Sequence, residues 1–148
     1  MQLNGTVTIR APRETVYAFL TDPHQVSQCA PGVESIEIIE PNKKFRAKAG
    51  IGFGAVKATF VGDAEWVELD PPHRAKVKAH GRGSGSAADV SSEMKLASDD
   101  QGNTVVSWTA DIAVLGQLAS LAARMMGPVS QKLTAQFFDC ARKKIETA

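Results

Sequence analysis

The stretch from residue 33 to residue 114 constrains the fold more than any other part of the chain. Its apolar and polar residues alternate, and turn-forming residues interrupt it at 41–42, 52–54, 70–72, 84–87 and 99–103. Alternation with a period of two is typical of strands. Breaks this closely spaced leave no room for crossover helices, so we expect about six strands in an antiparallel, hairpin-connected sheet.

The flanking segments add another strand and the helices. Residues 2–10 also alternate and predict a strand, whereas 12–20 predict a short helix because a proline and a glutamate occupy its first turn. Asp22 is the expected cap of a second short helix, which ends in the sequence CAPG at 29–32. After Leu115 the pattern becomes helical for roughly 30 residues.

The last segment predicts one long helix that ends near Glu146. Gly127-Pro128 interrupts it, but the same apolar stripe resumes afterwards, so we expect a kink rather than an end. This order of elements is typical of a helix-grip fold, in which a curved antiparallel sheet bends around the C-terminal helix. We therefore expect an α+β fold with about seven strands, forming a single domain over residues 1–148.

Three glycines occupy alternate positions in the segment Arg74–Gly85. The even positions are basic or polar, and the odd ones are small, with glycine at 81, 83 and 85. A phosphate-binding glycine loop would be followed at once by a helix, whereas here the alternation continues into another strand. The pattern predicts inward-facing glycines that allow close backbone approach, leave volume for a ligand or let the sheet bend.

A single helix cannot fill the hollow of a widely curved sheet, so we expect an apolar cavity between the two. Methionines suit an apolar ligand of variable shape, although on an inward stripe they are more often plain core. The predicted ligand-binding residues are Phe53, Phe60, Val77, Gly81, Gly83, Gly85, Val90, Met94, Trp108, Leu118, Ala122, Met125, Met126 and Val129.

No pattern in the sequence predicts catalysis or metal binding. The three histidines fall in turns or on a polar strand face, and Glu93 and Asp111 alternate outward. Cys29 and Cys140 have no partner at metal-ligand spacing, so we expect reduced, structural thiols. The 17 basic and 16 acidic residues nearly cancel, which gives no support for a nucleic-acid partner. These observations favour a binding protein over an enzyme.

Several segments resemble CoxG, the family of the carbon monoxide dehydrogenase G subunit, within the START/SRPBCC superfamily. They are APRETVYAFLTDPHQVSQCAPGVESIE (11–37), VELDPPHR (67–74), GRGSGSA (81–87), GNTVVSWTADIAVLGQLASL (102–121) and KLTAQFF (132–138). The resemblance implies a carrier that takes a respiratory quinone such as menaquinone between the membrane and a molybdenum-containing hydroxylase of the CO dehydrogenase type. Two alternatives stay open, namely an assembly or recruitment factor and a small cyclase or hydratase.

The resemblance also implies contact with the inner face of the cell membrane. No apolar run reaches the ~18 residues of a membrane span, so we expect a cytoplasmic protein with peripheral contact at most. Many family members carry a hydrophobic anchoring tail, and this chain ends at Ala148, so we expect no permanent anchor. Phe138 and Ile145 could enter an anionic bilayer with the nearby cations Lys132, Arg142, Lys143 and Lys144. Alternatively, the cations complement the helix dipole and Phe138 packs under a loop.

Overall fold

The computed structural model describes residues 1–147 and contains an antiparallel sheet and three helices. The elements are β1 (Gln2–Ile9), α1 (Arg13–Leu20), α2 (Pro23–Cys29), β2 (Val33–Glu40), β3 (Lys44–Phe53), β4 (Val56–Asp70), β5 (Arg74–Gly83), β6 (Ser86–Ser98), β7 (Thr104–Gly116) and α3 (Ala119–Glu146).

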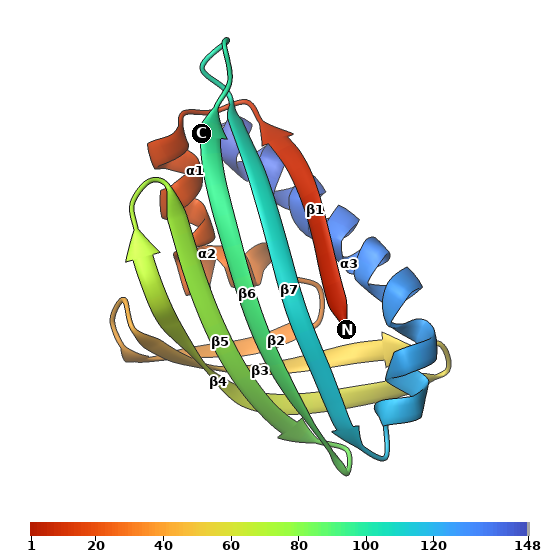
Figure 1. Ribbon diagram of the computed structural model, residues 1–148. Coiled ribbons are helices and arrows are strands. Elements are labelled where there is room, and N and C mark those ends of the chain that lie inside the picture. Colours follow the sequence, from red (N-terminus) through yellow and green to blue (C-terminus); the bar gives the residue numbers. More distant parts are fainter. Residues whose placement is uncertain (148) are drawn as a thin grey trace.

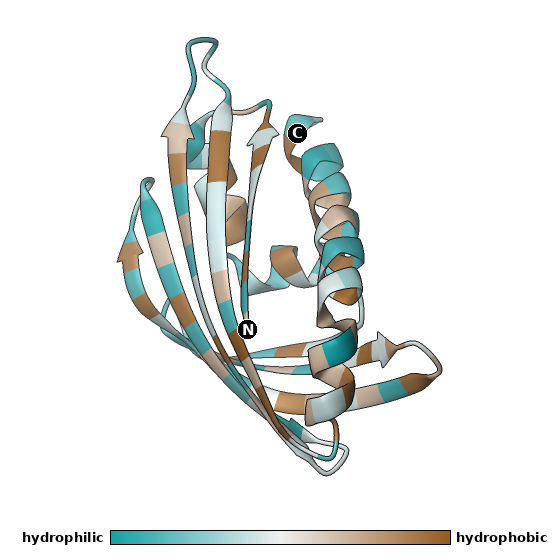
Figure 2. Ribbon diagram, turned by 45° about the vertical axis from the view of Figure 1, so that its right-hand side comes forward, coloured by the Kyte–Doolittle hydropathy of each residue, from teal (hydrophilic) through white to brown (hydrophobic). Residues whose placement is uncertain are grey.

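The strands form one 7-stranded sheet in the order β1-β7-β6-β5-β4-β3-β2. Strands β2, β3 and the first part of β4 run across the long strands β5, β6 and β7, so the sheet is strongly curved (Figure 1). α3 lies on the concave side and passes next to β1, the edge strand that pairs with β7 (Figures 1 and 2). The expected helix-grip arrangement is confirmed.

Local signals in the sequence account for the helix boundaries. The Asp22 side chain accepts a hydrogen bond from the backbone N–H of His24 at 3.0 Å, as expected for the cap of α2. α3 continues through Pro128 to Glu146 because the apolar residues on both sides of the proline pack on the same sheet. No helix within residues 1–147 combines the length and apolar character needed to cross a bilayer.

The core has two hydrophobic clusters, which lie under different halves of α3. The first joins α1 to the C-terminal half of α3 and contains Ile9, Val16, Leu96, Val106, Ala141 and Ile145. The second lies under the N-terminal half of α3 and contains Phe53, Ala58, Leu118, Ala122 and Met126. Hydrophobic and hydrophilic residues alternate along the strands, which gives the sheet an apolar inner face (Figure 2).

A disulfide joins Cys29, the last residue of α2, to Cys140 of α3, with their Cα atoms 5.4 Å apart. The prediction of two reduced thiols is therefore wrong. The two cysteines are separated by 111 residues, and only the packing of α2 against α3 brings them together. A spacing this long carries no information about pairing.

The structure also corrects the predicted membrane-facing surface of α3. Ile145 is 5% exposed and packs in the first core cluster. Phe138 packs edge-on against Phe137, with ring centroids 5.0 Å apart, and is half-buried. An α-helix has 3.6 residues per turn, so a fixed spacing of whole residues does not return to the same face. The apolar positions of α3 therefore shift gradually around the helix along its length. Ile145 is therefore not available to enter a bilayer, and Phe138 keeps only part of its surface exposed.

Candidate ligand-binding cavity

An apolar cavity of about 350 Å³ lies on the inner face of the sheet. The sheet contributes Val33, Ile36, Phe45, Ala47, Trp66, Ala75, Val77, Ser92, Met94, Val106 and Trp108. The helices and the residue after α2 contribute Leu20, Pro23, Val26, Ser27, Ala30, Phe137 and Phe138. This volume is within the usual range for small-molecule sites, about 300–1,000 Å³.

Strand register places the cavity between the two core clusters. Leu96 pairs with Val106 in the first cluster, and the next inward pair, Met94 and Trp108, lines the cavity. Further along the sheet, Val90 pairs with Ile112, which packs against the second cluster. The cavity is thus a gap in an otherwise continuous core.

The apolar side chains around this gap remain half-buried although they point toward the interior. Phe45, Trp66, Val77, Met94 and Trp108 all keep accessible surface. Protein interiors are normally packed to the density of organic crystals. The side chains of this protein therefore leave room for an apolar molecule, which would gain stabilisation by covering them.

The lining of the cavity has no titratable side chain among the described residues. Apart from the indole N–H groups of Trp66 and Trp108, its polar side chains within the described part of the chain are Ser27 and Ser92. Ser27 donates to the His24 carbonyl at 2.8 Å, and Ser92 donates to the Thr109 carbonyl at 2.9 Å. The walls offer apolar contact and exclusion of water, and no pair of groups positioned for proton transfer.

The predicted site residues fall into separate groups. Val77, Met94 and Trp108 line the cavity together. Val90 does not line the cavity, contrary to the prediction; it lies two residues before Ser92 on β6, between Ala79 and Ile112. The remaining apolar residues belong to the second core cluster or pack against it: Phe53, Phe60, Leu118, Ala122, Met125, Met126 and Val129. α3 approaches the sheet closely at its N-terminal half, so these side chains fill that end of the hollow.

The three glycines have different surroundings, and none of them lines the cavity. A Cβ at Gly81 would make ordinary contacts, the nearest being Phe60 Cβ at 3.6 Å. A Cβ at Gly83 would lie 1.8 Å from the Thr59 carbonyl oxygen, so this glycine permits close approach of β4. Gly85 is not on a strand face, contrary to the prediction. It forms a two-residue hairpin turn with Ser84, and both have positive φ, 72° and 53°.

Sequence reasoning missed the walls that α2, β2 and the C-terminal half of α3 contribute. Val26 and Ala30 are four residues apart and lie on one side of α2, facing the cavity. Ile36 has the alternating signal of β2, and Phe137 lies on the apolar stripe of the last helix. These signals show which residues are apolar and share a face. They do not show that α2 packs over the concave side of the sheet and forms one wall of the cavity.

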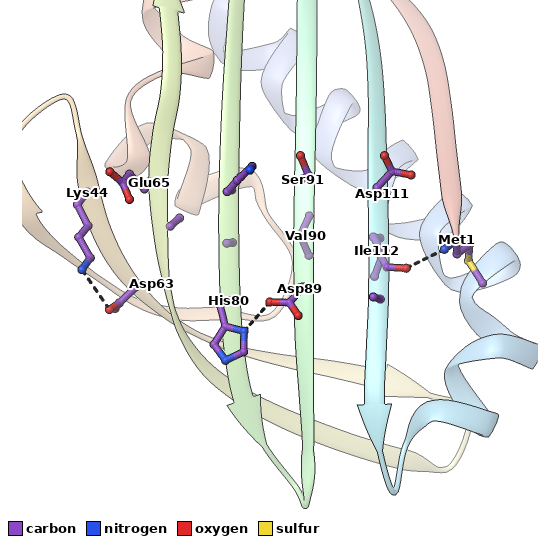
Figure 3. A pocket seen from close by; sticks show the side chains of 14 residues that line it. Met1, Lys44, Asp63, Glu65, His80, Asp89, Val90, Ser91, Asp111 and Ile112 are labelled. Carbon is purple, nitrogen blue, oxygen red and sulfur yellow. Dashed lines mark hydrogen bonds and ion pairs between the residues drawn. The ribbon is translucent and has the colours of Figure 1, made fainter.

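A larger hollow of about 630 Å³ lies on the outer face of the sheet, and several charged side chains line it together with small and apolar ones (Figure 3). His80 pairs with Asp89 at 2.5 Å, and Lys44 lies 3.8 Å from Asp63. Asp63 also accepts a hydrogen bond from Arg46, which lowers the pKa of its carboxyl. The Arg46–Asp63 pair therefore stabilises the fold at pH values above the pKa that Asp63 has in the unfolded chain. This stabilisation is lost as the pH falls through the lower pKa that Asp63 has in the folded protein. We interpret this hollow as a solvated surface of ion pairs.

Solved structures with similar folds cover almost the whole chain. A conserved protein from Geobacillus kaustophilus matches with a TM-score of 0.90 and 28% identity, over 99% of this chain and 96% of its own. A START superfamily protein from Mycobacterium smegmatis matches with a TM-score of 0.72 and 12% identity, over 99% and 97%. The Zhui aromatase/cyclase from Streptomyces sp. R1128 matches with a TM-score of 0.76 and 17% identity, over 99% and 93%.

These neighbours show that the chain has the fold of START superfamily proteins. None of the curated proteins matches the sequence of this chain. The model of the CoxG family, described as the G subunit of carbon monoxide dehydrogenase, matches residues 5–146. The match covers nearly the entire chain and agrees with the resemblance seen in the sequence. The protein therefore belongs to the CoxG family.

Proposed function

We propose that the protein is a non-catalytic carrier of a hydrophobic ligand, a respiratory quinone of the menaquinone type. It would exchange this ligand between the membrane and a molybdenum-containing hydroxylase of the CO dehydrogenase type. The observation that carries the proposal is the cavity of about 350 Å³, whose apolar walls are half-buried and lack titratable groups among the described residues. The family description supports the partner.

The lining residues fit the ring and prenyl groups of a quinone. Phe45, Trp66 and Trp108 offer flat aromatic surfaces for a ring, and Met94 offers an adaptable thioether. When bound, the quinone would supply the redox chemistry, because it accepts and returns electrons. The contribution of the protein is to bury the apolar ligand, keep water from it and release it to a partner.

Filling the cavity should abolish most of the binding. Val77 lines the middle of the inner face, where it pairs with Trp66 and Ser92 on the adjacent strands. We expect Val77→Phe to weaken binding of a short-tailed menaquinone by about tenfold or more, because the ring occupies the volume that the ligand needs. Quenching of Trp66 and Trp108, the two tryptophans of the chain, measures the binding.

The matched control is Val61→Phe, the same change at an outward position that is 46% exposed. It should leave both the affinity and the thermal melting of the protein unchanged. Solvent extraction and mass spectrometry of the purified protein provide an independent check. If the wild-type protein contains no isoprenoid or lipid and takes up no added menaquinone, the carrier function is refuted.

The alternative role as an assembly or recruitment factor leads to a different result with the same variants. An assembly factor should support dehydrogenase activity equally well with and without the Val77→Phe substitution, because its partner would bind the surface. A carrier with this substitution should still bind the dehydrogenase but no longer support quinone reduction. Gly83→Leu cannot make this distinction, because its side chain would collide with the backbone of β4.

A further inference from the structure

We infer that the groove between β1 and α3 is a second subsite, which holds the polar end of the ligand while the apolar part occupies the cavity. This inference rests on the proposed function and extends it. The groove has a volume of about 490 Å³. Trp108 and Phe138 line both the groove and the cavity, so these two aromatic side chains stand between the two spaces.

The groove differs from the cavity in the chemistry of its walls. β1 contributes Asn4 and Thr6, and α3 contributes Gln131, Thr134 and Arg142. The cavity, by contrast, has only serine hydroxyls and indole N–H groups as polar side-chain groups in the described part of the chain. An amphipathic molecule that crosses the aromatic boundary would therefore meet apolar walls at one end and hydrogen-bonding groups at the other.

The free edge of β1 adds backbone groups to the groove. Met1 and Ile112 exchange backbone hydrogen bonds of 2.9 and 2.8 Å. In an antiparallel pair every second residue bonds to the partner strand, so the odd-numbered residues of β1 bond to β7. The backbone N–H and C=O groups of the even-numbered residues point away from β7. Consistent with this, the Thr8 carbonyl accepts a hydrogen bond from Arg142 of α3 at 3.2 Å. Asn4 and Thr6 present their N–H and C=O groups to the same side. Within residues 1–147, α3 forms no hydrogen bond to either of them.

Trp108 supplies a donor at the boundary between the two spaces. Its indole lies over Gly5, where an added Cβ would be 2.8 Å from Nε1. Among the described residues Nε1 has no acceptor, yet it is not among the buried, unsatisfied atoms, so it keeps accessible surface. A partly accessible indole N–H can take water or a bound molecule as its hydrogen-bond partner. A ligand acceptor in the groove would provide one.

The available groups select a neutral ligand with hydrogen-bond acceptors. The Trp108 N–H and the guanidinium of Arg142 are both donors, which suits carbonyl oxygens. Asp139 and Arg142 both line the groove, and their opposite charges offset each other, so the groove offers no net positive charge for an anionic group such as that of an ionised fatty acid. The polar end is thus a neutral, carbonyl-bearing group, as in the ring of a quinone.

The test compares a short-tailed menaquinone with a polyprenyl hydrocarbon of the same tail, both measured by equilibrium dialysis. Trp108→Phe keeps an aromatic ring but removes the donor. It should weaken menaquinone binding by about tenfold more than it changes hydrocarbon binding, because one hydrogen bond contributes about that factor and only menaquinone can accept it. Trp66→Phe is the matched control, because Trp66 lines the cavity but not the groove. It should change the affinities for both ligands equally.

A second pair of variants tests the groove without altering the tryptophan. Thr134→Phe places a ring in the groove and should weaken binding of menaquinone but not of the hydrocarbon. Gln136→Phe, at an exposed position of α3 outside the groove lining, should affect neither. Thermal melting of each variant shows that it has folded.

Several results would overturn the subsite. If the wild-type protein binds both ligands and Trp108→Phe or Thr134→Phe affects them equally, the polar end does not lie in the groove. Tighter binding of an ionised fatty acid than of menaquinone would contradict the choice of a neutral group. If the wild-type protein binds neither menaquinone nor the hydrocarbon, the carrier function itself fails.

Discussion

Replacing both Cys29 and Cys140 with serine should lower the free energy of unfolding by about 4 to 5 kcal/mol. The disulfide closes a loop of 111 residues, so it removes much of the conformational entropy of the unfolded chain. The total stability of a domain is typically about 5–15 kcal/mol, so the variant would be close to its stability limit. Urea denaturation followed by tryptophan fluorescence measures the change.

The wild-type protein in excess reductant is the control, and its urea midpoint should match that of the double-serine variant. Each single serine variant should behave in the same way, because either one breaks the bond. Alkylation before and after reduction, followed by mass spectrometry, counts the free thiols. Two free thiols in protein purified without reductant would show that the bond does not form.

The same disulfide joins two segments whose neighbouring residues line the ligand cavity. Cys29 lies between Ser27 and Ala30 of the cavity wall, and Cys140 follows Phe137 and Phe138 of the opposite wall. The bond therefore holds α2 against α3 at the place where the cavity is covered. Loss of the bond should increase the rate of ligand release in addition to lowering stability.

Gly83→Ala should destabilise the protein by about 3 kcal/mol, a large effect for the addition of one methyl group. The added Cβ would lie 1.8 Å from the Thr59 carbonyl oxygen and 2.9 Å from its carbon, so the end of β5 would have to move away from β4. Backbone atoms cannot adjust as the end of a flexible side chain can. The midpoint of urea unfolding, together with the thermal midpoint, measures the loss.

Gly81→Ala is the matched control on the same face of the same strand. Its Cβ would lie 3.6 Å or more from its neighbours, so no atom has to move. This variant should be neutral or up to about 1 kcal/mol more stable, because glycine in a strand is entropically unfavourable. If both variants lose the same stability, the close approach at Gly83 does not determine the effect.

The order and type of elements were predictable because their signals are local. The alternation in residues 33–114 and the turn residues that interrupt it indicated a meander, which the structure confirms in β2 to β7. Asp22 indicated the start of α2, and its side chain forms the predicted cap. Such features depend on residues within a few positions of one another, so the sequence is sufficient to predict them.

The candidate site was only partly predictable. Val77, Met94 and Trp108 follow from alternation, but the same rule also selected Phe53, Phe60 and Met126, which pack in the second core cluster. Periodicity shows which side of an element faces inward. It does not show how far away the opposite wall is, and this distance decides whether a residue packs against another side chain or borders a cavity.

The sequence by itself determined an antiparallel sheet, its inner face, a long C-terminal helix and the family resemblance. Only the tertiary structure decided that α2 meets α3 and pairs Cys29 with Cys140, that β4 approaches β5 closely at Gly83, and that Ile145 is buried in the core. It also placed Trp108 between an apolar cavity and a polar groove. The reason is physical: local signals define faces and boundaries, whereas cavities and cross-links depend on distances between segments that are remote in the chain.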